Sequence, residues 1–164
     1  MFFASTTFTL IHTALSLVGI VAGAFVALGL LRSETRAGWT ALFFASTVAT
    51  SATGFFFPFD RFLPSHWVGV ISLIVLAVAL YARYATRLTG AWRPVYAVAA
   101  MAAFYLNVFV LVVQIFRRVP ALHALAPTES EPPFAIVQGI VLVLFAGLTI
   151  AAARAFHPRA AAPA

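Results

Sequence analysis

Residues 105–134 read YLNVFVLVVQIFRRVPALHALAPTESEPPF, and this stretch decides how the chain folds. Its beginning completes an apolar run, Val95–Phe116, that stops at Arg117 and Arg118. An apolar run of about 20 residues is long enough to cross the hydrocarbon core of a bilayer as a helix. A polar loop rich in proline follows, and a second apolar run begins at Phe134. The pattern predicts two antiparallel membrane helices joined by the longest loop of the chain.

The rest of the sequence repeats this pattern. Hydrophobic residues make up 63% of the 164 residues and charged residues only 9%, more apolar surface than a soluble domain can bury. The apolar runs number five: Phe8–Leu31, Trp39–Phe57, Trp67–Ala85, Val95–Phe116 and Phe134–Ala153. A helix satisfies its own backbone in lipid, so each run is expected to be helical. We therefore expect an all-α integral membrane protein, with a single five-helix bundle over residues 1–156 and a disordered cytoplasmic tail over 157–164.

Arginine placement predicts the orientation of this bundle. Alternating crossings put seven arginines on one side of the membrane, namely Arg32, Arg36, Arg83, Arg87, Arg93, Arg154 and Arg159. The other side receives three, namely Arg61, Arg117 and Arg118. The positive-inside rule then places the N-terminus outside and the C-terminus in the cytoplasm. We expect a multi-pass protein of the bacterial inner membrane.

Composition also argues against several classes of function. The net charge of +6 comes from arginines at the ends of apolar runs rather than from one basic patch, so a nucleic-acid partner is not expected. The chain has no cysteine, which excludes disulfides and thiolate metal sites. No nucleophile motif is recognisable and no carboxylate lies within a predicted helix, so the sequence gives no specific indication of an enzyme.

Polar side chains within or next to the helices gather towards the predicted outer side. Polar groups are costly in lipid, so they should face a cavity or another helix. We expect a cavity that binds a small amphiphilic ligand such as a quinone or a lipid, with aromatic walls and polar contacts from His12, Thr50, Asn107, Gln114, Gln138 and His123. For Thr50 and its neighbours in the hydroxyl stripe of the second run, bonding to the helix's own backbone is the alternative.

Two other hypotheses remain open from the sequence. His12 and His66 lie at similar predicted depth on different helices and are candidate axial ligands of haem b, or part of a zinc or copper site. Alternatively, the histidines form only local hydrogen bonds and the protein is an accessory subunit of a larger membrane complex or a homo-oligomer. The lipid bilayer is a partner in every case.

Two further patterns predict local structure. Gly19 and Gly23 form a GxxxG motif, which allows another helix to approach the first one closely. The loop segment Arg117–Glu131 is expected to cover the mouth of the cavity, with its arginines paired to Glu129 and Glu131.

Overall fold

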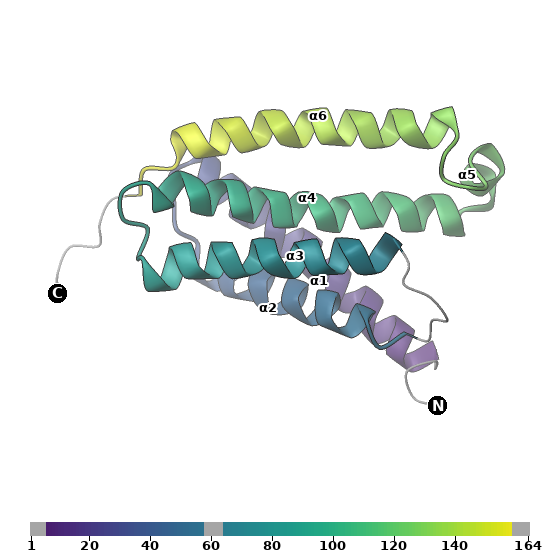
Figure 1. The fold of residues 1–164 in the computed structure, drawn as a ribbon, viewed down its shortest axis with the longest axis horizontal. Helices are drawn as coiled ribbons and strands as arrows, with labels where there is room; N and C mark the ends of the chain where they lie inside the picture. The colour runs from purple at the N-terminus through teal and green to yellow at the C-terminus, as the bar shows by residue number, and fades with distance from the viewer. Residues whose placement is uncertain (1–5, 58–63, 159–164) are drawn as a thin grey trace.

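The computed structural model describes residues 6–57 and 64–158, and this part of the chain is all-helical, without strands (Figure 1). The helices are α1 (Thr6–Leu31), α2 (Ala37–Gly54), α3 (Pro64–Leu80), α4 (Trp92–Arg118), α5 (Pro120–Leu125) and α6 (Pro132–Ala155). A π-helical turn, η2 (Tyr81–Ala85), continues α3. The expected all-α fold is confirmed.

Within the described residues, four helical segments are long and apolar enough to cross a membrane: Thr6–Leu31, Ser65–Ala85, Trp92–Arg118 and Pro132–Ala155. The structure therefore confirms a membrane protein with four candidate spans. The predicted second span corresponds to α2, which is not among them. Its 18 residues include six hydroxyl side chains, which lower its hydropathy: Thr40, Ser46, Thr47, Thr50, Ser51 and Thr53.

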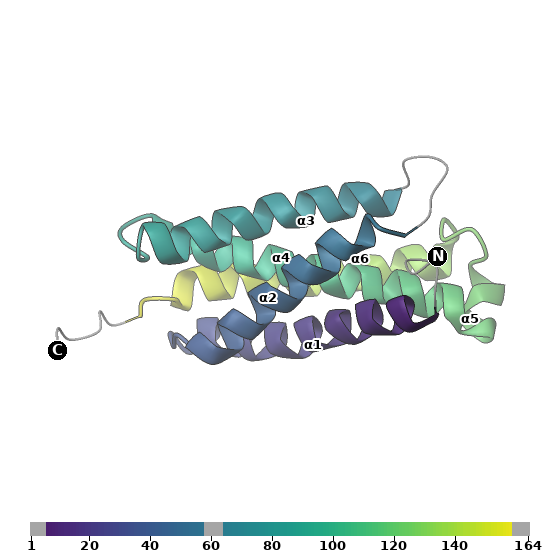
Figure 2. The same cartoon turned by 90° about the horizontal axis from the view of Figure 1, so that it is seen from below.

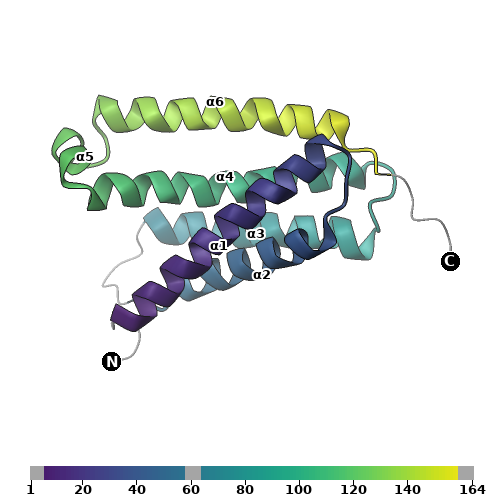
Figure 3. The same ribbon diagram turned by 180° about the vertical axis from the view of Figure 1, so that it is seen from behind.

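The helices pack as an antiparallel bundle around α4. Figure 2 shows α2 running obliquely between α1 and α3, and it contacts both. Figure 3 shows α1 crossing α4 obliquely, while α6 lies along α4 and α3 packs beside it. The short α5 lies at the end of the bundle where α4 stops and α6 begins. The sequence pattern predicts only a loop there, because a six-residue helix is too short to show a periodic pattern.

The GxxxG motif of α1 lies in the helix crossing, as expected. Gly23 is buried, and a Cβ atom added to it would lie 2.6 Å from Cδ2 of Phe104 on α4. Around this contact the core contains small and aromatic residues, including Ala22, Phe43 and Ala103. The absence of a side chain at Gly23 thus allows α1 to lie directly against the Phe104 ring.

Helix α6 is the most exposed of the candidate spans. Of the 18 residues that form its most apolar segment, only 11% are buried within the protein, whereas 39% of the corresponding segment of α1 are buried. Gly139 and Gly147 have no atom within 4 Å of an added Cβ. The outer face of α6 is therefore available to lipid or to another protein.

The predicted tail begins next to a buried residue. Phe156 is 1% exposed, and the backbone N–H of His157 donates a hydrogen bond to Oγ of Ser33 at 2.8 Å. Residues 159–164 of the predicted tail lie outside the described residues, as do residues 58–63, which include Arg61.

Candidate functional site

A buried hydrogen bond joins α2 to α4 in the middle of the bundle. Nδ2 of Asn107 donates to Oγ1 of Thr47 over 3.0 Å. Asn107 is 8% exposed and Thr47 is fully buried, so the carboxamide points inward as its cost in lipid predicts. Gly19 of α1 covers this pair, because an added Cβ would lie 3.1 Å from the Thr47 hydroxyl and 3.2 Å from that of Ser46.

A second polar contact joins α1 to α2 nearer the end of the bundle that carries α5. Nδ1 of His12 lies 2.9 Å from Oγ1 of Thr53. The Thr53 hydroxyl also contacts the carbonyl oxygens of Ala49 and Thr50, at 2.7 and 3.2 Å. The His12 ring meets Phe57 edge-on, with 5.0 Å between the ring centroids. His12 is thus held between the two helices by one polar and one aromatic contact.

Helix α2 also contacts α3 through polar and aromatic side chains. The Ser51 hydroxyl donates to Ser72 over 3.1 Å, and both groups lie within the bundle. His66 is 5% exposed, and its ring stacks on Phe55 with 5.6 Å between centroids. Helix α2 therefore makes side-chain hydrogen bonds to three other helices, which is how polar residues hold membrane helices together.

The two histidines proposed as haem ligands contact different sides of α2. His12 packs against Thr53 and Phe57, whereas His66 packs against Phe55. Phe55 and Phe57 follow the end of α2 at Gly54, and α2 lies between α1, which carries His12, and α3, which carries His66 (Figure 2). Among residues 6–57 and 64–158, no group of three or more histidine or carboxylate side chains is arranged to hold a metal ion.

Two buried polar atoms of the described residues lack a hydrogen-bond partner: Oγ1 of Thr50 and Oε1 of Gln138. Leaving such a group unpaired costs about 1–3 kcal/mol, so each position needs an explanation. Both residues were predicted to bind a ligand. Gln138 uses its Nε2 atom to donate to the Phe109 carbonyl oxygen of α4 at 3.1 Å, which leaves only its oxygen free.

The structure divides the six predicted ligand residues among three places. His12, Thr50 and Asn107 lie along α2 and belong to one polar cluster. Gln138 lies on α6 and donates instead to the backbone carbonyl oxygen of Phe109 on α4. The last two predicted residues, Gln114 and His123, are found at the end of the bundle.

These two residues lie near the bundle surface rather than beside the polar cluster. Oε1 of Gln114 accepts a hydrogen bond from Nε of Arg118 at 3.1 Å. His123 is exposed on α5. Gln114 lies in the last turns of α4 and His123 on the short α5 that follows it, so both are far along the chain from the residues of α4 that contact α2.

The loop between α5 and α6 is held by its own side chains. Arg117 pairs with Glu129 at 3.2 Å, one of the pairings predicted from the sequence. The other predicted partner, Glu131, instead accepts hydrogen bonds from the Thr128 hydroxyl and from the backbone N–H groups of Thr128 and Ser130. Partial loss of hydration raises the pKa of the Glu131 carboxyl, but these hydrogen bonds outweigh it and hold the pKa below its ordinary value.

Three members of the polar cluster are not among the site residues predicted from the sequence: Ser46, Thr47 and Thr53. The signal that could have found them is the spacing of hydroxyl groups along the second apolar run, which recurs every three or four residues. Some of these hydroxyl groups bond to the backbone of their own helix, which was the alternative to ligand binding for the hydroxyl stripe. Ser46, for example, donates to the carbonyl oxygen of Leu42 at 2.7 Å.

Comparisons of the chain with family models, with curated proteins and with solved structures return no match. The polar cluster around α2 is therefore the feature of the molecule from which a function can be inferred.

Proposed function

We propose that α2 is a fifth membrane span, and that the end of the bundle carrying α5 faces the outside of the bacterial inner membrane. The 18 residues of α2 extend about 27 Å as a helix, which is close to the thickness of the hydrocarbon core of a bilayer. Contacts with α1 and α3 on either side shield its hydroxyl groups from lipid. The excess of arginine in the loops at the opposite end supports this orientation.

Cysteine labelling tests the orientation, and the chain contains no cysteine to interfere. Thr89 and Ser130 are both exposed and lie at opposite ends of the bundle. In intact cells, a membrane-impermeant maleimide is expected to label Ser130→Cys at once, but Thr89→Cys only after the membrane is opened. The reverse pattern would invert the topology, and labelling of both positions in intact cells would show that α4 does not cross the membrane.

We further propose that the protein binds a small amphiphilic molecule, quinone-like or lipid-like, with its polar head beside Thr50. The unpartnered Thr50 hydroxyl is the observation that carries this proposal. A hydroxyl group is both a donor and an acceptor, so it would donate to a carbonyl or ester oxygen of the ligand. Such a bond would remove the cost of leaving the Thr50 hydroxyl unsatisfied.

The neighbours of Thr50 suit this class of ligand. The His12–Thr53 pair lies one helical turn away and adds an imidazole group towards the same end of the bundle. Phe8 and Phe57 provide apolar walls there, with 4.9 Å between their ring centroids. A mostly apolar site with few polar groups is typical of small-molecule sites in proteins. No charged side chain is needed, so the ligand's head would be neutral.

Binding of a decyl-substituted benzoquinone tests this proposal. We expect saturable quenching of tryptophan fluorescence in phosphatidylcholine nanodiscs, with about fivefold weaker binding by Thr50→Val, because one hydrogen bond contributes about 1 kcal/mol. Thr50→Val should fold at least as stably as the parent, since it removes an unpaired buried hydroxyl. Thr149→Val on α6 is the matched control and should bind normally. Equal affinity of the Thr50→Val variant and the parent would refute the proposal.

Two observations bear on the alternatives left open by the sequence. The haem or metal hypothesis depends on His12 and His66. A Soret band, or stoichiometric zinc or copper by elemental analysis, that is lost in both His12→Ala and His66→Ala would establish it. His12 and His66 contact α2 from different helices, α1 and α3. This arrangement supports the haem or metal hypothesis less well than it supports binding of a neutral ligand. The accessory-subunit hypothesis is supported by the exposed outer face of α6, which a partner protein or a second copy would cover.

A further inference from the structure

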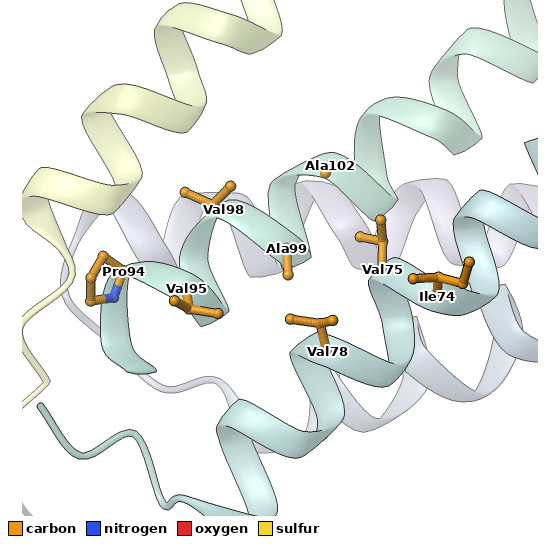
Figure 4. Close-up of a pocket in the computed structure, with 8 residues that line it drawn as sticks. All are labelled: Ile74, Val75, Val78, Pro94, Val95, Val98, Ala99 and Ala102. Carbon is orange, nitrogen blue, oxygen red and sulfur yellow. The ribbon is translucent and has the colours of Figure 1, made fainter. Parts of the chain in front are cut away.

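An apolar groove runs between α3 and α4 near the arginine-rich end of the bundle (Figure 4). Its volume of about 430 Å³ lies within the range of small-ligand sites. Its walls come from Ile74, Val75 and Val78 on α3, and from residues of α4 that include Val95, Val98 and Ala99. No polar side chain lines it. The groove therefore fits a hydrocarbon chain but provides no contact for a polar head.

Aromatic residues continue the groove towards the end of the bundle. Tyr81 follows Val78 by one turn, and its ring meets that of Trp92 at the start of α4, with 5.2 Å between centroids. Both side chains are partly exposed, at 55% and 36%. Tyrosine and tryptophan are typical of the level where lipid headgroups meet the hydrocarbon core. A chain in the groove would have its headgroup beyond this pair.

The segment joining the two groove helices is positively charged. It contains Arg83, Arg87 and Arg93, with no acidic residue between Tyr81 and Trp92. Arg83 turns inward, where its guanidinium lies 5.6 Å from the Tyr96 ring centroid. Nε of Arg93 donates to the Leu88 carbonyl oxygen at 2.9 Å, which fixes the side chain and leaves its terminal nitrogens for another acceptor. Arg87 is exposed.

We infer that this groove binds one anionic phospholipid, with an acyl chain between α3 and α4 and the phosphate near Arg87 and Arg93. The chemistry on each side matches: hydrocarbon walls for the chain, interfacial aromatics for the glycerol region, and guanidinium groups for the phosphate. Basic sites between membrane helices on the cytoplasmic side select anionic headgroups in this way. This site is separate from the polar cluster around Thr50, which lies in the opposite half of the bundle.

Quenching by brominated lipids tests the assignment. A variant with Trp92 as its only tryptophan, Trp39→Phe with Trp67→Phe, is placed in vesicles of phosphatidylcholine containing 20% phosphatidylglycerol, with bromine on the chains of one lipid at a time. We expect quenching of Trp92 to show several-fold preference for phosphatidylglycerol. Arg87→Gln should reduce the preference about fivefold, the factor for one arginine at an anionic surface. Arg32→Gln, an exposed arginine at the same end, should not change it.

A groove-filling variant separates binding in the groove from attraction to a charged surface. Ala102→Phe places a ring in the groove and should remove the preference while leaving all arginines in place. Ala146→Phe on the exposed face of α6 is the matched control and should retain it. Circular dichroism checks that each variant is folded. Equal quenching by the two lipids in the parent, or a preference that survives both Arg87→Gln and Ala102→Phe, would overturn the inference.

Discussion

Replacing Gly23 by alanine is expected to lower the free energy of unfolding by about 1–3 kcal/mol, the usual cost of overpacking a close contact. The new Cβ atom would lie 2.6 Å from Cδ2 and 3.0 Å from Cγ of Phe104. These atoms are at the base of the ring, so a small rotation does not remove the clash. The ring is also held between Phe43 and Phe145, whose centroids lie 6.4 and 5.1 Å away. Helix α1 would have to move away from α4.

Unfolding in mixed micelles by a denaturing detergent measures this effect. Gly147→Ala is the matched control, because nothing lies within 4 Å of its added Cβ and alanine is the better helix former. We expect this control to be neutral or slightly stabilising. Equal stability of Gly23→Ala and Gly147→Ala would show that α1 and α4 are not packed as described.

Replacing Asn107 by leucine is expected to destabilise the protein by about 1 kcal/mol. The change removes the hydrogen bond to Thr47 and leaves the threonine hydroxyl without its donor inside the bundle. Hydrogen bonds between membrane helices contribute about 0.6 kcal/mol on average and up to about 1.7 kcal/mol. This bond is fully enclosed by α1, α2 and α4, so we expect a value in the upper part of that range.

A double-mutant cycle with Thr47→Val isolates the bond from other effects of each substitution. We expect the second substitution to cost little once Asn107 is leucine. Gln114→Leu is the control on the same helix, since Gln114 bonds only to the exposed Arg118 and should tolerate the change. Additive effects of Asn107→Leu and Thr47→Val would show that the two side chains do not interact.

The lipid and ligand proposals concern opposite ends of the same bundle, and their tests are independent. Loss of quinone binding in Thr50→Val involves a hydroxyl of α2, whereas lipid selectivity depends on the segment between η2 and α4. Failure of one experiment therefore leaves the other proposal standing.

The sequence alone determined that the chain forms helices and that lipid surrounds them. Apolar runs of sufficient length impose this result, because a backbone in hydrocarbon must satisfy its own hydrogen bonds. It also predicted the close approach at Gly23 and the inward direction of Asn107, since both follow from the size or polarity of one side chain. These are properties that a residue carries regardless of which helix it meets.

Tertiary structure decided which polar residues meet. His12 and His66 look equivalent in the sequence, yet His12 on α1 contacts Thr53 and Phe57, whereas His66 on α3 contacts Phe55. Asn107 and Gln138 look like parts of one site, yet Asn107 of α4 bonds to Thr47 of α2, whereas Gln138 of α6 bonds to the backbone of α4. The apolar groove beside Trp92 has no sequence signal, because valine and alanine occur throughout the spans. Helix crossing angles and rotations depend on the fit of many side chains together, and no single stretch of sequence contains that information.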